Sequence, residues 1–367
     1  MNPQVSVFRV DQREFARTIM INFVGEKFVS FDVFATRAWT PVDWERVPLN
    51  IRRFPGRFAL DFVKPIAISF VKIVVHGQLS GASFSIEFLD RLELRDILRL
   101  IAKKKIAFVG CARNCSGDLT ETIRKLNEIG SNFESYLIHV FENDSVDDTV
   151  VQLELLERLY PGVFRYTSVV GLDGYMHKRT ARLAYARNLL IDIVRDGPDF
   201  DYVCVLDLDG IVRSDFDEIG FFSCFSVADA WDGVFPVCNG SYYDMWAMRH
   251  NQISPDDYTQ ALERADRALG DDLARFFGAF SRSASLKDLD GWLSVSSAFG
   301  GLAVYKASSI GTARYVGLDG DREVCEHVSF NLDIIRTGGA LYINPQLVVA
   351  SPPSGDRGKI IERLFRT

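Results

Sequence analysis

The segment 202–212 constrains the fold of this chain more than any other feature. It reads Tyr-Val-Cys-Val-Leu-Asp-Leu-Asp-Gly-Ile-Val, an unbroken apolar run that ends in Asp207 and Asp209. Short β-branched runs of this kind are typical of strands that are buried on both faces of a parallel sheet. Ligands of open α/β sheets bind beyond the carboxyl ends of the strands. We therefore expect both aspartates at such an end, where their oxygens suit Mg²⁺ or Mn²⁺ carrying a phosphate. Two solvated loop aspartates are the alternative.

Length and composition indicate a globular protein with two domains, or with one large domain and an appendage. The chain has 367 residues, of which 47% are hydrophobic and 25% charged. Its net charge of −7 argues against a general nucleic-acid binder, which would present a basic face. The apolar segment 66–75 contains Lys72 and is much shorter than the ~20 residues of a transmembrane helix. We therefore expect no transmembrane segment.

The cysteines and the start of the chain favour a cytoplasmic protein. The six cysteines show no disulfide framework, and Cys204 lies inside the apolar segment, where it is expected to pack as a small hydrophobe. The first residues carry no apolar leader. We expect the protein in the cytoplasm, with peripheral association at the inner face of the membrane as an open alternative.

Two domains are expected, with a boundary near residue 100. Residues 1–100 are rich in phenylalanine and contain alternating stretches such as 84–88, which are typical of antiparallel strands. This part is predicted to be a small β-rich accessory domain of unknown role, closed by an amphipathic helix near 92–103. From Lys105 strands and helices alternate, which predicts a largely parallel α/β sheet, a Rossmann-like nucleotide-binding fold, over residues 101–367.

The elements of this second domain are predicted from apolar periodicity and turn residues. Besides the acidic strand, the pattern predicts strands at 106–109, 136–141, 163–169, 233–237 and 294–305. It predicts helices at 118–129, 147–159, 178–195, 255–280 and 326–336.

Polar residues follow the first two of these strands, and a helix rich in arginine precedes the acidic strand. Arg113 offers a planar guanidinium fork for a phosphate or a base edge. Helix capping is the alternative role near Asp147, and a solvated basic face is the alternative for the arginines of the helix. Glu142 is less easily explained by capping, and Asn188, beside Leu189 and Leu190, is expected to face inward.

Taken in order, these segments resemble a known family. The order is Ala-Arg-Asn after the first strand, Glu-Asn-Asp-Ser after the second, Arg179-x-x-x-Leu-Ala-x-x-Arg187-Asn188 on the helix, and then the Asp-x-Asp strand. The set resembles the fungal capsule-associated α-mannosyltransferase family, within the GT-A-fold glycosyltransferases, roughly over residues 105–350. The first hundred residues lie outside the resemblance.

The resemblance implies a nucleotide-sugar donor, a GDP- or UDP-sugar, lying across the edge of a GT-A sheet. Mn²⁺ or Mg²⁺ would bridge its diphosphate to Asp209, and Asp207 would contact the cation through water or contact the ribose of the donor. A retaining mannosyltransferase of surface polysaccharide synthesis, with a glycan or glycolipid acceptor, is the specific function implied. The residues implied around the nucleotide are Ala112, Arg113, Glu142 and Asp144, with Arg187 and Asn188 supporting the donor.

The C-terminal part of the chain is expected to complete the site. In the GT-A fold a third cation ligand often comes from this part, and His327 is the candidate, with a structural histidine as the alternative. Asp244 and Trp246 lie in an aromatic segment suited to stacking on acceptor sugars, or to packing in a core. Asp290 or Glu326 could act as the catalytic base if transfer inverts the sugar, whereas retaining transfer needs no obvious base.

Three other interpretations compete with a glycosyltransferase. The segment 205–212 is close to the first motif of haloacid-dehalogenase-like phosphatases, in which Asp207 would be the nucleophile and Mg²⁺ the cofactor. That motif normally opens its domain, whereas three strand–helix units precede it here. A sugar-nucleotide pyrophosphorylase should carry a glycine-rich phosphate loop after the first strand, which this chain lacks. A lectin-like protein that has kept the fold is the third alternative.

Overall fold

A computed structural model describes the protein over residues 4–10, 15–36, 40–88, 92–213, 216–240, 242–257, 259–260, 262, 270, 273, 286 and 291–350, without the side chains of 26–28. The chain forms two compact units. The first consists mainly of the residues up to Leu92, and the second contains most of the chain from Glu93 onward.

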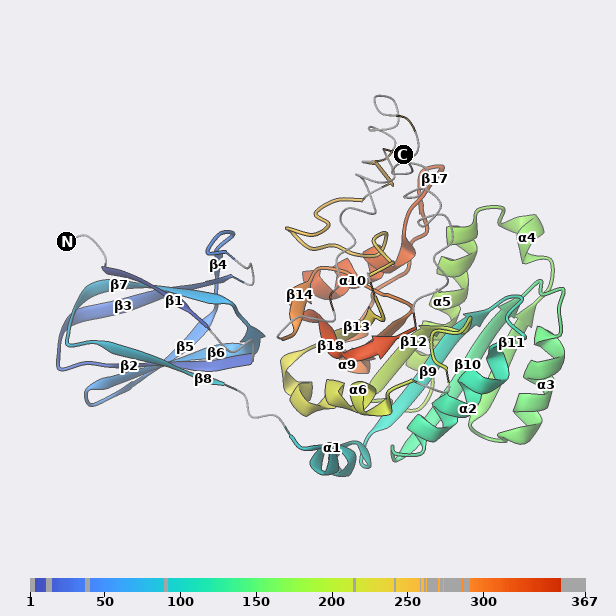
Figure 1. Ribbon diagram of the computed structural model, residues 1–367, viewed down its shortest axis with the longest axis horizontal. Helices are drawn as coiled ribbons and strands as arrows, with labels where there is room; N and C mark the ends of the chain where they lie inside the picture. Colours follow the sequence, from blue (N-terminus) through green and yellow to red (C-terminus); the bar gives the residue numbers. More distant parts are fainter. Residues whose placement is uncertain are drawn as a thin grey trace, which may run out of the picture. The chain divides into compact units, whose positions relative to one another are not determined.

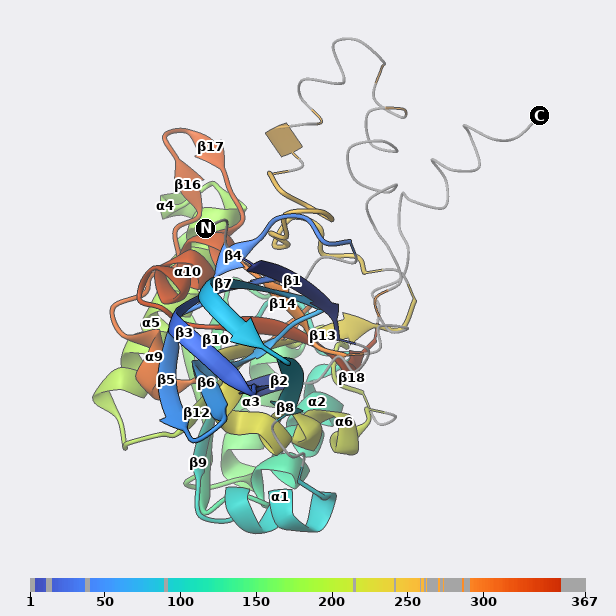
Figure 2. The ribbon, with the colours of Figure 1, turned by 90° about the vertical axis from the view of Figure 1, so that its left-hand side faces the viewer.

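The first unit is a β-sandwich, drawn in blue in Figures 1 and 2. One four-stranded sheet has the order β1-β7-β3-β4, and the other has the order β5-β6-β2-β8. Apolar side chains from both sheets, such as Ile73 and Leu60, form the core between them. Side chains of β8 alternate between exposed and half-buried, as the alternating sequence predicts. The strands are β1 (Gln4–Arg9), β2 (Phe15–Asn22), β3 (Gly25–Thr36), β4 (Glu45–Arg46), β5 (Leu49–Phe54), β6 (Arg57–Ala67), β7 (Phe70–Ser80) and β8 (Ser83–Phe88).

An eight-stranded sheet forms the centre of the second unit. Its order is β11-β10-β9-β12-β15-β13-β18-β14. The first four strands of this order are mutually parallel, and β15 runs antiparallel to both β12 and β13. The strands are β9 (Lys105–Ala112), β10 (Ser135–Asn143), β11 (Phe164–Val169), β12 (Tyr202–Asp207), β13 (Gly233–Cys238), β14 (Leu293–Val295), β15 (Leu302–Lys306) and β18 (Leu341–Val349). The α/β class and the β-rich first unit predicted from the sequence are confirmed.

Helices cover both faces of this sheet (Figure 1). From β9 the chain passes through α2 to β10 and through α3 to β11, each time toward the β11 edge of the sheet. It then returns through α5 to β12, on the other side of β9. Because such crossovers are right-handed, α5 lies on the opposite face of the sheet from α2 and α3. Helix α10 packs on α5, and α6 contacts β18. The helices are α2 (Leu119–Gly130), α3 (Thr149–Leu159), α4 (Leu172–Tyr175), α5 (Arg179–Asp196), α6 (Glu218–Ser223), a 3₁₀ segment (Cys224–Ala230), α9 (Ala307–Ile310) and α10 (Glu326–Arg336).

Two predictions differ from the observed structure. Helix α1 (Leu94–Ile101) belongs to the second unit, because it packs on α6, so the boundary lies earlier than residue 100. The strand predicted at 294–305 is two strands, β14 and β15, separated by the turn at Gly300 and Gly301. The helix predicted at 255–280 falls largely outside the described residues. A short hairpin of β16 (Leu318–Asp319) and β17 (Arg322–Glu323) precedes α10.

None of the helices in the described parts of the chain is long and apolar enough to cross a membrane.

Candidate functional site

The polar residues expected at one edge of the sheet do lie there. In the parallel register Asp207 of β12 pairs with Cys111 of β9, and Ala112 of β9 pairs with Glu142 of β10. The carboxyl ends of three neighbouring strands are therefore level. Gly110 permits this close pairing, because a Cβ atom there would stand 2.7 Å from the Leu206 carbonyl oxygen.

Arg187 is the central cation of the site. Its side chain is only 5% exposed, and its Nη2 donates to Asp207 Oδ1 at 2.9 Å. Its Nη1 donates to the buried carboxylate of Glu326, at the start of α10. One guanidinium thus joins α5 to the end of β12 and to α10. The two carboxylates compensate the charge of Arg187, which could not otherwise be buried. The structure places Arg187, a residue expected near the donor, in ion pairs with Asp207 and Glu326.

Asp207 lies close to other carboxylates as well as to Arg187. Burial, together with the carboxylates of Asp209 and Asp244, raises its pKa to about 6, against the opposing effect of Arg187 and Arg179. Asp209, two residues along, is exposed. Asp207, Asp209 and Asp244 thus place three carboxylates near the buried Arg187. A bound cation would reduce the repulsion among these carboxylates.

A divalent cation could bind at this edge if the protein shared its coordination with a bound phosphate. The donors are carboxylate oxygens, which suit Mg²⁺ and Mn²⁺. Within the described residues no group of three or more His, Cys, Asp or Glu side chains lies together in a way that could hold a metal ion. The protein would therefore supply one or two carboxylates, and phosphate and water would complete the coordination.

A glycine pair joins Asp207 to the segment that follows β13. Gly300 and Gly301 have φ angles of +65° and +90°, which favour glycine. The Asp207 amide donates to the Gly301 carbonyl at 2.9 Å, and the Gly300 amide donates to Asp244 Oδ2 at 3.0 Å. A side chain at Gly301 would also collide with Ile211 and the Tyr243 hydroxyl. The turn therefore fixes Asp207 and Asp244 to one another.

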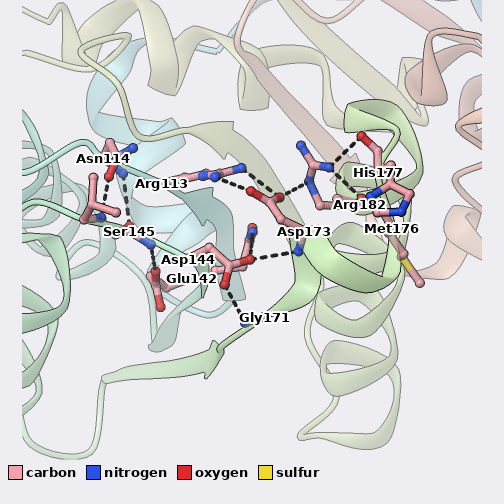
Figure 3. A network of polar contacts seen from close by, with 12 residues as sticks. Arg113, Asn114, Glu142, Asp144, Ser145, Gly171, Asp173, Met176, His177 and Arg182 are labelled. Atoms are coloured by element: carbon pink, nitrogen blue, oxygen red, sulfur yellow. Dashed lines mark hydrogen bonds and ion pairs between the residues drawn. The ribbon is translucent and has the colours of Figure 1, made fainter.

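A second polar network lies beyond β9, β10 and β11 (Figure 3). Arg113 binds the carboxylate of Asp173 with both terminal nitrogens, one of them at 3.0 Å, and Arg182 Nε lies 2.8 Å from the same carboxylate. Asp144, with a φ angle of +51°, accepts from the amides of Gly171 and Asp173. These bonds hold the loop between β11 and α5 against the edge of the sheet.

Glu142 fixes the turn after β10 from inside. Its carboxylate is buried, and it accepts from the Ser145 amide at 2.8 Å and from the Ser168 hydroxyl. The Asn114 amide donates to the Ser145 hydroxyl at 3.1 Å, which ties the first turn to the second. Ala112 is buried beneath both turns. Glu142 and Ala112 are therefore buried within the edge, whereas Arg113 is exposed at its surface.

Asn188 anchors α5 to the segment before β16. Its side-chain amide donates to the Tyr315 carbonyl at 2.9 Å and accepts from the Tyr315 amide at 2.9 Å. Both polar ends of the Asn188 side chain are therefore used within the protein. It positions Arg187, its neighbour on the helix, by fixing the helix itself.

His327 lies among aromatic rings. Its ring stacks on Phe299 with centroids 3.5 Å apart and meets Tyr315 edge-on at 5.5 Å. Both ring nitrogens are buried and have no hydrogen-bond partner among the described residues, and burial lowers the pKa of His327 well below its usual value. Nε2 is 3.9 Å from a carboxylate oxygen of Glu326. Asp290, the other expected base, lies outside the described residues.

Asp173 is not among the residues predicted from the sequence. The residue pairs with Arg113 and Arg182 across 60 and 9 positions of chain, and it lies in the short helix α4. No spacing rule links an aspartate in a surface turn to an arginine after a distant strand. A net surplus of arginine near the predicted edge is the only available signal.

Comparisons with known proteins give weak similarities. No protein-family model matches the chain, and no curated protein matches it. The chain is similar to the solved structure of mannosyltransferase PcManGT from Pyrobaculum calidifontis in complex with GDP-Man and Mn²⁺, with 14% identity and a TM-score of 0.41. The match covers 71% of this chain and 61% of the other, so this chain spans less than two thirds of that structure.

Two further solved structures are similar at the same level. Glucosyl-3-phosphoglycerate synthase of M. tuberculosis has 11% identity and a TM-score of 0.41, covering 73% of this chain and 80% of that one. TarS 1-349 of S. aureus has 12% identity and a TM-score of 0.37, covering 71% and 64%. At such similarity the function has to be inferred from the residues of the site itself.

Proposed function

We propose that this protein is a metal-dependent glycosyltransferase of the GT-A type, which transfers a sugar from a nucleotide-sugar donor to a glycan or glycolipid acceptor. The observation that carries the proposal is the pair Asp207 and Asp209 at the carboxyl end of β12, the first half-buried and the second exposed. Ligands of open α/β sheets bind at this edge.

The charges of the site suit a nucleoside diphosphate with its cation. Mn²⁺ or Mg²⁺, when bound, would act as a Lewis acid that stabilises the charge of the departing diphosphate. Asp209 would bind the cation directly, and Asp207 would contact the cation through water or contact the ribose of the donor. Arg187 holds the Asp207 carboxylate in place, and exposed Arg179 at the start of α5 is close enough to favour its charged form. A phosphate near the start of α5 would be attracted both by the guanidinium of Arg179 and by the positive end of the helix dipole.

The network of Figure 3 is proposed to hold the nucleotide. Arg113 is exposed and binds a carboxylate with both terminal nitrogens; a phosphate or a base edge can accept from the same forked group. Asp144 and Glu142 fix the two turns beside it. Following the family resemblance, we take GDP-mannose as the donor and surface polysaccharide synthesis as the setting, at the cytoplasmic side of the membrane.

A haloacid-dehalogenase-like phosphatase has no specific observation in its favour. Its nucleophile would be the Asp207 carboxylate, of which Oδ1 accepts from Arg187. Three strands with their helices, β9 to β11, precede β12 in the chain, whereas the phosphatase motif opens its domain.

A thermal-shift screen tests the proposal. The chain is melted with GDP-mannose, UDP-glucose and CMP-sialic acid, each with Mn²⁺ and with EDTA. We expect one nucleotide sugar to raise the melting temperature only when Mn²⁺ is present, since a ligand at a hundred times its dissociation constant stabilises a protein by about 2.7 kcal/mol. Stabilisation by Mg²⁺ with beryllium fluoride, and by no nucleotide sugar, would instead support the phosphatase.

A further inference from the structure

The first unit and the rest of the chain differ in charge. Residues 1–92 contain 12 Lys and Arg against 9 Asp and Glu, a net charge of +3. Residues 93–367 contain 30 Lys and Arg against 40 Asp and Glu, a net charge of −10. Such an asymmetry within one chain indicates that the basic part binds an anionic partner.

The positive charge of the first unit is concentrated on one sheet of the sandwich, the sheet of β5, β6, β2 and β8 (Figure 2). The strands of this sheet carry five basic residues against two acidic ones, Asp61 and Glu87. The strands of the other sheet carry four basic residues against three acidic ones. The five basic side chains of the first sheet are all exposed, and they are Arg17, Arg52, Arg53, Arg57 and Lys64.

Three of these arginines lie at the turn between β5 and β6, in residues 51–57, which we call the basic hairpin. Arg52, Arg53 and Arg57 fall within six consecutive residues. The turn contains Gly56 with a φ angle of +66°, and Phe54 pairs with Arg57 across it. Strand β5 is an outer strand of its sheet. One short turn at the border of the sheet therefore presents three guanidinium groups.

An aromatic ring holds two of these guanidinium groups in place. The Cζ atom of Arg52 is 5.6 Å from the centre of the Phe54 ring, and the Cζ atom of Arg57 is 5.1 Å from it. Contacts of this length between a cation and a ring are attractive. Arg52 also binds the carboxylate of Asp61 with two nitrogens, of which Nη2 is at 2.8 Å. The charge of Arg52 is thus compensated within the sheet, and Arg53 and Arg57 are the arginines of the hairpin to be tested.

Apolar groups lie beside the arginines of the basic hairpin. Ile51 is 49% exposed, Pro55 is exposed at the turn, and Phe54 is half-buried. A polyanion in water attracts only the charges. The surface of an anionic bilayer offers phosphates to arginines and, just below them, an interface at which aromatic side chains are enriched. The mixture of arginines with Phe54 and Pro55 therefore favours a bilayer over a nucleic acid or an anionic polysaccharide.

We propose that the basic hairpin docks the first unit on a membrane of anionic lipids. Its guanidinium groups donate to the phosphates of the lipid headgroups, which accept the forked geometry of arginine. Phe54 and Pro55 lie at the level of the headgroups. The inference goes beyond the proposed function and does not depend on it. A chain that binds anionic vesicles but no nucleotide sugar would support the docking surface and contradict the glycosyltransferase.

The test is co-sedimentation of the full chain with vesicles of phosphatidylcholine alone or of equal parts of phosphatidylcholine and phosphatidylglycerol. We expect binding to the mixed vesicles only. The double variant Arg53→Ala, Arg57→Ala should bind them about 30-fold more weakly, because each basic residue near an anionic membrane contributes roughly 1 kcal/mol. Arg53→Lys, Arg57→Lys keeps both charges and should retain most of the binding. Arg314→Ala, Arg336→Ala, which removes two exposed arginines of the second unit, is the matched control and should bind normally.

Two further measurements locate the docking surface. Raising NaCl from about 0.1 M to about 1 M shortens the Debye length from about 10 Å to about 3 Å and should release the chain from the vesicles. The tryptophan emission of Phe54→Trp should move to shorter wavelength when mixed vesicles are added, whereas that of Val7→Trp, at an exposed position of β1 in the other sheet, should not.

Four results would each overturn the docking surface. They are equal binding to both kinds of vesicle, full binding by Arg53→Ala, Arg57→Ala, an equal loss of binding in the second-unit control, and binding to dextran sulfate without binding to vesicles. The last result would assign the hairpin to a dissolved polyanion instead of a membrane.

Discussion

Arg187 and Asp207 form an ion pair of 2.9 Å at the point where the central strand of the second unit ends. The same guanidinium binds Glu326 on α10, and its carbon atom lies 5.2 Å from the centre of the Phe299 ring. One buried cation therefore joins three elements that are far apart in the sequence. The geometry of the proposed catalytic edge depends on this single side chain.

Substituting Arg187 with alanine should destabilise the protein strongly. The change leaves the buried carboxylate of Glu326 and the half-buried one of Asp207 without their partner, and breaking a buried ion pair typically costs about 3–5 kcal/mol. Urea unfolding followed by circular dichroism measures the loss. Arg336→Ala, which removes an exposed ion pair with Asp333, is the control and should cost about 1 kcal/mol or less. Equal losses for the two variants would contradict the central role of Arg187.

Substituting Asp209 with asparagine should leave the fold intact and remove the response to Mn²⁺. Asp209 is exposed, so we expect a change below about 0.5 kcal/mol in the free energy of unfolding without metal. The additional stabilisation by GDP-mannose with Mn²⁺ should disappear. Asp319→Asn, at another exposed aspartate, provides the comparison in the same melting experiment. A variant of Asp209 that still responds to Mn²⁺ would exclude this residue as a ligand.

Substituting Arg113 with alanine should weaken nucleotide binding about tenfold and hardly affect stability. Its ion pair with Asp173 is half-exposed and is worth about 1 kcal/mol or less, whereas a hydrogen bond to a charged ligand contributes about 1.5–3 kcal/mol. Calorimetric titration with GDP in the presence of Mn²⁺ measures the affinity. Arg165→Ala, which removes a more exposed arginine, should bind GDP normally. Unchanged affinity for Arg113→Ala would move the nucleotide away from the network of Figure 3.

Two buried histidines should make the fold sensitive to acid. Burial lowers the pKa of His139 and of His327 below 6.5, so both stay neutral in the folded state and gain protons on unfolding. Stability should therefore fall as the pH falls below 6.5, by up to about 1.4 kcal/mol per pH unit for each histidine. Asp207, whose pKa is raised to about 6, opposes this between pH 6 and its unfolded value of 3.8.

Unfolding experiments at pH 7.5 and 5.5 test this dependence in the unsubstituted chain and in a His139→Gln, His327→Gln variant. The contribution of Asp207 is common to both chains and cancels in the difference. We expect the variant to lose less stability on acidification. Identical pH profiles would mean that the histidines titrate alike in the folded and unfolded states.

Local sequence patterns predict much of the second unit but not its sheet order. Apolar runs and their turn residues locate β9 to β12 and helices α2, α3 and α5, because each pattern is set by neighbours within a few residues. The insertion of antiparallel β15 between β12 and β13 depends on pairing across about a hundred residues, as between Leu206 and Leu302. No local pattern records that pairing.

The same limit applies to the site. The strand that ends in Asp207 can be recognised from its apolar run. Asp207 can be recognised as a functional residue because a buried apolar strand has no structural need of a carboxylate at its end. The partner of Arg187 is not visible, since Glu326 lies 139 positions away. Glu326 and His327 look like free functional groups in the sequence, whereas packing places one in an ion pair and the other against Phe299.

The most direct test of the proposed cation site is the binding of Mn²⁺, measured by electron paramagnetic resonance of the free ion. Because the protein supplies only one or two carboxylates, the account predicts weak binding of Mn²⁺ alone and binding at least tenfold tighter when GDP-mannose is present. Asp209→Asn should abolish that gain. Tight binding of Mn²⁺ without a nucleotide sugar, or no gain when one is added, would contradict a cation shared between β12 and the diphosphate of a donor.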